Sequence, residues 1–242
     1  MTITAGRPRS ESTRPVRLRQ LPGLDGLRAV AVVAVIVYHL NSSWLPGGFL
    51  GVDVFFVISG YLITSLLLSE HSRTGNVVLL RFWARRARRL LPALAVLLLG
   101  VAVLAACFAR DGLAAMRWDL PAAMGYVLNW RLLLEHASYM SSFGRPPLLQ
   151  HLWSLSIEEQ FYLFWPPALL LLRRHLSRER VATVALGGAA VSAALMAALY
   201  SPGHPSGVYF ASETHAQGLL IGCALAAAVP PWRMTSRVSD GA

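Results

Sequence analysis

The sequence predicts an all-α integral membrane protein: a polytopic helical bundle with six transmembrane helices and one further segment that is re-entrant or interfacial. Apolar residues make up 55% of the 242 residues and charged residues only 14%, and the mean hydropathy is +0.50. The apolar residues form runs of about 20, the length that crosses a bilayer. Arginines gather between these runs, so the net charge of +10 indicates membrane topology rather than nucleic-acid binding.

Six apolar runs are long enough to be predicted as membrane-spanning helices. They lie at about 24–44, 49–68, 90–108, 152–172, 181–200 and 213–229. A seventh run, at about 119–134, is short and contains Asn129 and Arg131, so its status depends on the charges around it.

The arginines decide the topology. Five precede the first run, six lie between the second and third, four between the fourth and fifth, and two follow the last, whereas the loops at 41–48 and 201–212 have none. If 119–134 does not cross, all these arginines share one side, as the positive-inside rule requires. We therefore expect a multi-pass protein of the cell membrane with both termini cytoplasmic. Its predicted parts are a disordered arginine-rich tail (1–23), a membrane domain (24–229) and a C-terminal tail (230–242).

Ionisable residues inside membrane spans are costly, which makes them functional candidates. On the first predicted helix, the spacing places Asp25, Arg28 and His39 on one face, with Arg28 about 16 Å from His39 along the axis. Asp53 enters the second helix at the depth of His39, where a carboxylate could orient the imidazole. The alternatives remain an interfacial Asp25–Arg28 pair, a histidine at a helix end, and Asp53 as a helix N-terminal residue.

Two further stretches have the residue types of a binding site. In HLWSLSIEEQFYLFWP, His151, Glu158 and Tyr162 fall on one helical stripe, and the glutamates and Gln160 need partners inside an apolar run. We expect Glu158 to lie at the same depth as His39 and Asp53. In RFWARRARRLLP, the clustered arginines suit phosphate groups, or else they set the topology and contact lipid headgroups. These arginines are Arg85, Arg86, Arg88 and Arg89.

Five stretches together resemble the acyltransferase-3 family, integral membrane O-acyltransferases that acylate cell-surface and secreted carbohydrates. They cover roughly residues 21–229 in the family's order: LDGLRAVAVVAVIVYH, GFLGVDVFFVISGYLIT, RFWARRARRLLPAL, LLQHLWSLSIEEQFYLFWP and ETHAQGLLIGCALA. The resemblance implies that His39 is the essential catalytic histidine and that Arg86 and Arg89, the family's R-x-x-R, hold the phosphates of the acyl donor.

The resemblance completes the set of expected site residues. The expected catalytic residues are His39, Asp53 and Glu158. The expected donor-binding residues are Arg28, Arg85, Arg86 and Arg89. The expected substrate-binding residues are Ser59 and Tyr61 of the S-G-Y motif, Gln160 of E-x-Q-F-Y, and His151. No metal and no permanently bound cofactor is expected.

The predicted function is transfer of an acyl group, acetyl in the first instance, from acyl-CoA as co-substrate to a hydroxyl of a carbohydrate or glycolipid acceptor in a lipid bilayer. A proton-coupled transporter is the alternative from another class, because intramembrane His, Asp and Glu also form proton relays. A non-catalytic truncated remnant is the third. The family domain usually has about ten spans, so we expect this chain to be its N-terminal part. Thr214-His215 stands where the family often has Thr-Arg.

Overall fold

The computed structural model describes residues 22–109, 112–135, 147–202 and 205–229, and within these ranges every regular element is a helix. The 3₁₀ turns η1 (Gly48–Leu50) and η3 (Gln150–Leu152) precede α2 and α6. The α-helices are α1 (Pro22–Leu40), α2 (Gly51–Thr74), α3 (Leu79–Phe108), α4 (Leu113–Met124), α5 (Leu128–Leu134), α6 (Trp153–His175), α7 (Arg178–Leu199), α8 (Pro205–Phe210) and α9 (Ser212–Ala228). Nearly all of both predicted tails lies outside the described residues.

Each of the six predicted apolar runs is a helix, and four of these helices are long and apolar enough to cross a membrane. These four cover Gly23–Leu40, Gly48–Thr74, Leu79–Phe108 and Arg178–Leu199. The other two runs correspond to α6, which carries charged residues at both ends of its apolar stretch, and to α9, which has 17 residues. The chain is thus a helical membrane protein with four candidate spans, and the count of six remains a prediction.

The seventh run forms two short helices instead of one span. α4 and α5 have 12 and 7 residues, so they rise only about 18 Å and 10 Å, short of the roughly 30 Å hydrocarbon core. The break lies at Gly125–Val127, where Tyr126 has a φ of 55°, a left-handed conformation uncommon for a residue with a side chain. This geometry fits the expected re-entrant or interfacial segment.

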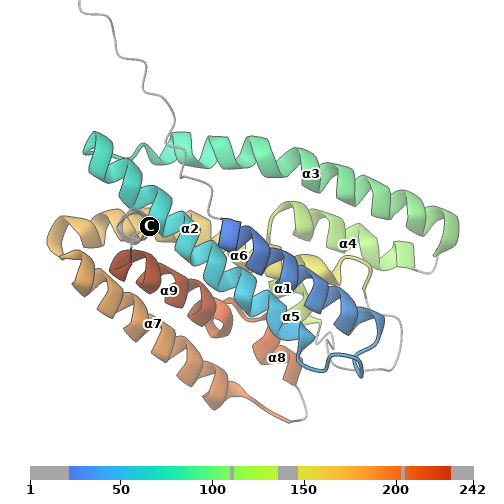
Figure 1. Cartoon of the computed structure of the whole chain (residues 1–242). Helices are drawn as coiled ribbons and strands as arrows, with labels where there is room; N and C mark the ends of the chain where they lie inside the picture. Colours follow the sequence, from blue (N-terminus) through green and yellow to red (C-terminus); the bar gives the residue numbers. More distant parts are fainter. Residues whose placement is uncertain (1–21, 110–111, 136–146, 203–204, 230–242) are drawn as a thin grey trace, which may run out of the picture.

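α9 packs between α2 and α7, and α1 lies along α2 (Figure 1). The α2–α9 crossing depends on glycine: a Cβ added to Gly60 would overlap the backbone of Leu219, and one added to Gly222 would overlap that of Val57. Small residues at such crossings let two helix backbones approach closely. The last helix of the described chain is therefore held directly against the centre of the bundle.

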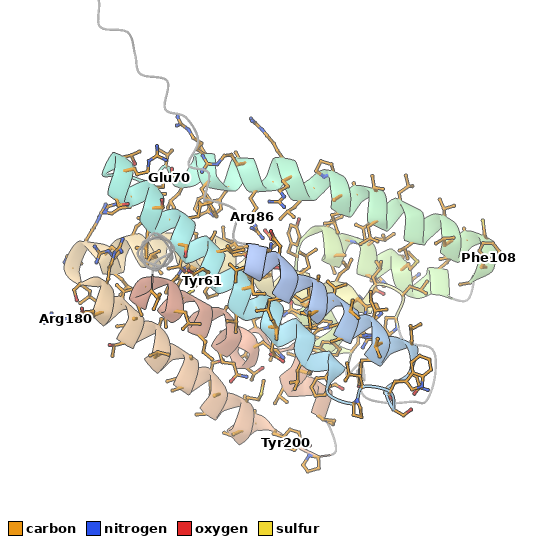
Figure 2. All side chains as sticks on the ribbon, viewed as in Figure 1. Tyr61, Glu70, Arg86, Phe108, Arg180 and Tyr200 are labelled. Atoms are coloured by element: carbon orange, nitrogen blue, oxygen red, sulfur yellow. The ribbon has the colours of Figure 1, made fainter. Side chains whose placement is uncertain are left out.

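The bundle has two chemically different ends. Figure 2 shows Glu70 and Arg180 towards one end and Phe108 at the other. The first, here named the arginine-rich end, gathers the last turns of α2 and α6 and the first turn of α7, with basic residues in all three. The opposite, named the histidine end, holds the last turn of α1 and the turn before α6. The cytoplasmic side of the arginine-rich end is a prediction from the charges.

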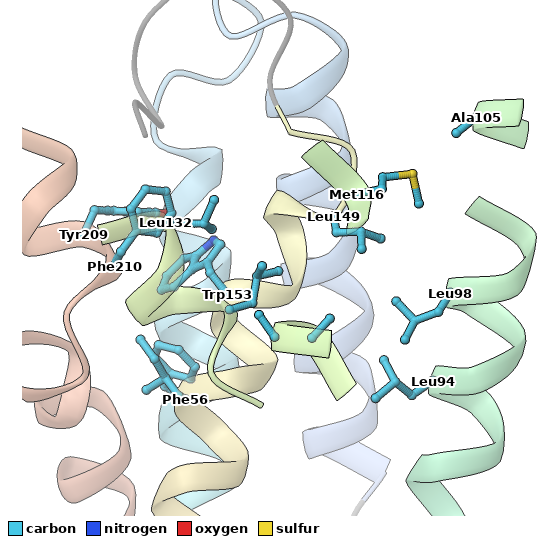
Figure 3. Packing of buried hydrophobic residues seen from close by; sticks show 14 of the residues in the cluster. Phe56, Leu94, Leu98, Ala105, Met116, Leu132, Leu149, Trp153, Tyr209 and Phe210 are labelled. Carbon is cyan, nitrogen blue, oxygen red and sulfur yellow. The ribbon is translucent and has the colours of Figure 1, made fainter. Parts of the chain in front are cut away.

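Two apolar clusters fill the bundle. In the cluster nearer the histidine end, the rings of Phe56, Trp153 and Phe210 pack together, and Leu94 and Leu98 reach in from α3 (Figure 3). The cluster nearer the arginine-rich end joins α2, α3, α6, α7 and α9 through residues such as Leu67, Phe82, Leu169, Val181 and Cys223. These clusters fix the faces of α2 and α6 on which the polar site residues lie.

Candidate functional site

His39 lies in the last turn of α1, with its side chain exposed. Its Nδ1 lies 2.7 Å from the carbonyl oxygen of Val35. A carbonyl can only accept, so Nδ1 must carry the proton, which puts the imidazole lone pair on Nε2. The backbone of α1 itself thus sets the tautomer that a general base or nucleophile requires.

The structure brings His151 against His39. The ring centroids lie 4.7 Å apart at an angle of 81°, so one imidazole meets the other edge-on. His151 lies in η3, just before α6, and both the desolvation of its ring and the nearby His39 lower the pKa of His151. A neutral His151 adds no positive charge beside His39 when His39 takes up a proton. The expected substrate-binding residue His151 thus lies beside the expected catalytic His39.

Asp53 lies in the first turn of α2, as expected. Within the described ranges, however, no hydrogen bond or ion pair joins its carboxylate to another side chain, and the rings that contact His39 are those of Tyr38 and His151. The expectation that a carboxylate orients His39 is corrected in one respect: the carbonyl of Val35 makes that bond. The catalytic role of Asp53 remains a prediction.

Glu158 belongs to a separate group, here named the carboxylate cluster: Ser59, Arg86, Glu158, Glu159 and Tyr162. Oε1 of Glu158 accepts a hydrogen bond from Ser59 Oγ and one from Tyr162 Oη at 2.6 Å. Glu158 follows His151 by seven residues, which places it about 10 Å further along α6. The expectation that Glu158 shares the depth of His39 is therefore wrong, because the residue that contacts His39 lies in the turn before α6.

Arg86 reaches the cluster from α3 and pairs with Glu159. Its Nε lies 2.9 Å and its Nη2 2.6 Å from Oε1 of Glu159, and Nη2 lies 3.9 Å from Glu158. The guanidinium carbon sits 3.5 Å from the centroid of the Tyr162 ring, a cation–π contact. Side chains of this ion pair are mostly buried, at 25% and 13% exposed. The guanidinium group of Arg86 therefore binds carboxylates of the protein itself, whereas the resemblance of the R-x-x-R motif implied that it binds phosphate.

The other expected donor-binding arginines are placed differently. Arg85 pairs with Glu70 at 3.3 Å near the arginine-rich end. Arg89 is exposed and Arg28 is half-buried, and among the described residues neither forms an ion pair with a protein carboxylate. Arg28 and Arg89 are thus the two predicted donor ligands whose guanidinium groups are not used within the described protein.

Gln160 holds elements together. It closes a ring of three hydrogen bonds: Gln160 Nε2 donates to Asn129 Oδ1 (2.9 Å), Asn129 Nδ2 to Ser212 Oγ (2.9 Å), and Ser212 Oγ to Gln160 Oε1 (2.7 Å). A further bond joins Gln160 to the carbonyl of Tyr126 at 2.8 Å. This network fixes α5 against α6 and α9, and two of its members, Gln160 and Ser212, also line one side of a cavity. Its expected substrate role remains a prediction.

The cavity, of about 260 Å³, opens between α5, α6 and α9. Besides Gln160, Ser212 and Glu213, its lining is apolar, with Trp130, Phe161 and Phe164 among its walls. Ser59 and Tyr61, the remaining expected substrate residues, are buried in α2, and Tyr61 Oη donates to the carbonyl of Val229 at 3.3 Å. The structure therefore brings His39 to His151 and Ser59 to Glu158, but leaves Tyr61 and Gln160 in other surroundings.

Sequence reasoning missed Glu159, Asn129 and Ser212 as specific partners. One signal for Glu159 existed, because a pair of glutamates in an apolar run requires cations nearby. In the described ranges, no group of three or more His, Cys, Asp or Glu side chains is placed to hold a metal ion. The side chains that the structure brings together carry imidazole, carboxylate and guanidinium groups, which are suited to proton transfer and to binding of anionic or amide-containing ligands.

Comparison with known proteins gives a consistent picture. A family model described as "Acyltransferase domain" matches residues 21–238. The chain is 47% identical over 224 residues to "Putative O-acetyltransferase SACOL0978" of Staphylococcus aureus (strain COL), covering 92% of this chain and 37% of that protein. It is 47% identical over 210 residues to "Peptidoglycan O-acetyltransferase OatA" of Listeria monocytogenes, covering 86% and 34%. The chain thus spans about a third of the length of these relatives. No solved structure matches it.

Proposed function

The chain belongs to the acyltransferase-3 family, and from this we propose that it is a membrane-embedded O-acyltransferase that moves an acetyl group from acetyl-CoA to a hydroxyl group of a cell-wall or cell-surface carbohydrate. The acceptor class follows the names of the relatives, one of which is a peptidoglycan O-acetyltransferase. The chain covers about a third of the length of those proteins. We therefore propose for it only the steps that side chains of these helices can carry out.

The observation that carries the proposal is the state of His39. Val35 holds Nδ1 as a donor at 2.7 Å, so Nε2 is the nitrogen able to accept a proton at the exposed end of α1. In the proposed step, Nε2 takes the proton of the acceptor hydroxyl as the oxygen attacks the acyl carbonyl. The imidazolium then returns the proton to the leaving thiolate. General acid–base catalysis of this kind contributes about 10²–10⁴-fold.

The donor is proposed to bind through arginine. Thioester donors of the coenzyme A type carry several phosphate charges, which guanidinium groups recognise by paired hydrogen bonds. Arg28 and Arg89 are the candidates, because Arg86 and Arg85 already pair with Glu159 and Glu70. A cytoplasmic donor would enter from the arginine-rich end, which the positive-inside rule places inside the cell.

The test compares two imidazoles. His39→Ala should lower acetyl transfer to un-acetylated peptidoglycan at least about 100-fold, because the general base is lost. The matched control is His175→Ala, which removes an exposed imidazole at the opposite end of the bundle. Both variants should insert into membranes and unfold at the wild-type temperature. The readout is labelled acetyl ester formed in vesicles from a host that has no O-acetylation of its own. Undiminished transfer by the His39 variant would refute the assignment.

A further inference from the structure

Glu158 presents one oxygen that the protein does not use. In the described part of the chain, both of its hydrogen bonds go to Oε1, from Ser59 and Tyr162, so these two donors fix the plane of the carboxylate. Oε2 has no hydrogen-bond partner there, although the side chain is only 23% exposed. A carboxylate oxygen that is held in place on a mostly buried side chain, with no partner among the described residues, can accept a hydrogen bond from a ligand.

The spacing of the polar groups suggests which ligand. Glu158 lies about 10 Å from His151, and hence from the His39 ring that His151 contacts, measured along α6. Arg28 lies about 16 Å from His39 along α1. Towards the arginine-rich end, Glu158 thus lies at the shorter distance from His39 and can accept a hydrogen bond from an amide N–H. Arg28, which can bind a phosphate, lies further away.

In the pantetheine arm of coenzyme A, an amide N–H and a phosphate lie at similar distances from the acyl carbon. In an extended arm, the amide N–H remote from the sulfur is about 8 bonds from the acyl carbon, and the first phosphorus about 14 bonds, which is about 10 Å and 17 Å at roughly 1.2 Å per bond. With the acyl carbon beside His39 Nε2, the remote amide therefore comes level with Glu158, and the phosphates come level with Arg28. Free thioesters without the arm have neither group.

The direction of Arg28 agrees with this alignment. Val35 on α1 faces Gly51 at the start of α2, where its methyl group would be 2.8 Å from an added Cβ. Arg28 precedes Val35 by seven residues, about two helical turns, so both side chains leave α1 on the same face, towards α2. Ser59, the donor to Glu158, belongs to α2. Arg28 and the carboxylate cluster therefore share one side of α1.

We propose that the carboxylate cluster is the binding subsite for the pantetheine arm of the donor, with Oε2 of Glu158 accepting the hydrogen bond of its remote amide N–H and Arg28 binding its phosphates. The inference rests on the proposed function and gives Glu158 a donor-binding role in place of an acid–base one. Glu159 and Tyr162 act as positioning residues, because they hold Arg86 and the carboxylate of Glu158 in place.

Three acetyl donors separate the subsites: acetyl-CoA, acetyl-pantetheine, which lacks the nucleotide and phosphates, and ethyl thioacetate, which lacks the arm. Glu158→Gln should raise KM about tenfold for the first two donors, since a charge-assisted hydrogen bond is lost, and leave the third unchanged. Arg28→Gln should raise KM for acetyl-CoA alone. The matched control Glu179→Gln changes an exposed carboxylate at the start of α7 and should alter none of the three.

Binding gives a second readout that does not need turnover. The Kd of pantetheine, measured by calorimetry on the purified chain in detergent, should rise about tenfold in Glu158→Gln and stay constant in Glu179→Gln. Equal losses with all three donors, or a change confined to KM for the acceptor, would overturn the subsite. If the wild-type protein used none of the three donors, the proposed function itself would be refuted. If the wild-type protein transferred the acetyl group and Glu158→Gln had the same KM values, only this inference would be refuted.

Discussion

The histidine pair and the carboxylate cluster lie about 10 Å apart along α6, yet they are built in opposite ways. His39 and His151 are exposed, touch each other edge-on, and lie at the ends of their elements. Arg86, Glu158 and Glu159 lie within helices and are interlocked by ion pairs and hydrogen bonds. The first region places two imidazoles side by side at the surface, and the second holds charges in a fixed arrangement. Under the proposed function, reaction and donor binding would be separated along α6.

The largest expected effect is a loss of thermal stability when the ion pair of the carboxylate cluster is broken. Arg86→Ala leaves the carboxylate of Glu159 without its partner, which should cost on the order of 3 kcal/mol and lower Tm by roughly 6–12 °C. Thermal unfolding in detergent measures it. Arg89→Ala, an exposed arginine one turn away on the same helix, should change Tm by less than about 2 °C.

The double variant Arg86→Met with Glu159→Leu decides whether the pair itself is needed. Replacing both members by apolar residues should recover most of the lost stability, because no buried charge is left unpaired. If Arg86→Ala were as stable as the wild type, the ion pair would not order the cluster and the contrast between the two regions would fail.

A moderate effect is expected at the other region. His151→Phe keeps an aromatic ring against His39 but removes both ring nitrogens, so acetyl transfer should fall about tenfold while Tm stays constant, as for the loss of one hydrogen-bonding group in a reaction site. The kcat and KM for donor and acceptor, measured separately, locate the loss. A drop in Tm comparable to that of Arg86→Ala would show that the histidine pair is structural too.

The smallest effect concerns the orientation of the bundle in the membrane, on which entry of the proposed donor depends. Cysteines placed at the exposed positions Ser43 and Ser201 should react with an impermeant thiol reagent in intact cells, and one at Ser177 should not, once Cys107 and Cys223 are replaced. Relative to the cysteine-free parent, the changes at Ser43 and Ser201 should alter Tm by no more than about 2 °C. Labelling at Ser177 from outside would invert the arginine-rich end and require the donor to enter from the other side.

The helices could be predicted from the sequence far better than the contacts between them. Runs of about 20 apolar residues predict helices, and all six runs are helical. The start of α3 was not predicted: it begins at Leu79 instead of near residue 90, because the arginine stretch is itself helical. Hydropathy does not show which helices are neighbours. The Arg86–Glu159 pair therefore could not be located from the sequence, although two adjacent glutamates indicated that cations were needed.

The site shows the same limit at the level of single bonds. His39 could be singled out because a histidine in an apolar helix is rare, but its hydrogen bond to Val35 depends on the rotamer, which the pattern does not contain. Likewise, the depth of Glu158 depends on where the histidine end meets α6, and that is fixed by the turn at 150–152. Residue identity was predictable here, and mutual position was not.

The glycine crossing of α2 and α9 has a mechanical consequence. With no side chains between the two backbones, α2 and α9 have no compressible layer and move as one frame, to which α7 is attached. α3, by contrast, buries only Phe82, Leu94, Leu98 and Ala105 over its 30 residues. The apolar stretches of α1 and α3 are buried to only 6% and 17%, so a widening of the bundle should move these helices against that frame. Amide hydrogens should therefore exchange earlier in α1 and α3 than where Gly60 meets Leu219.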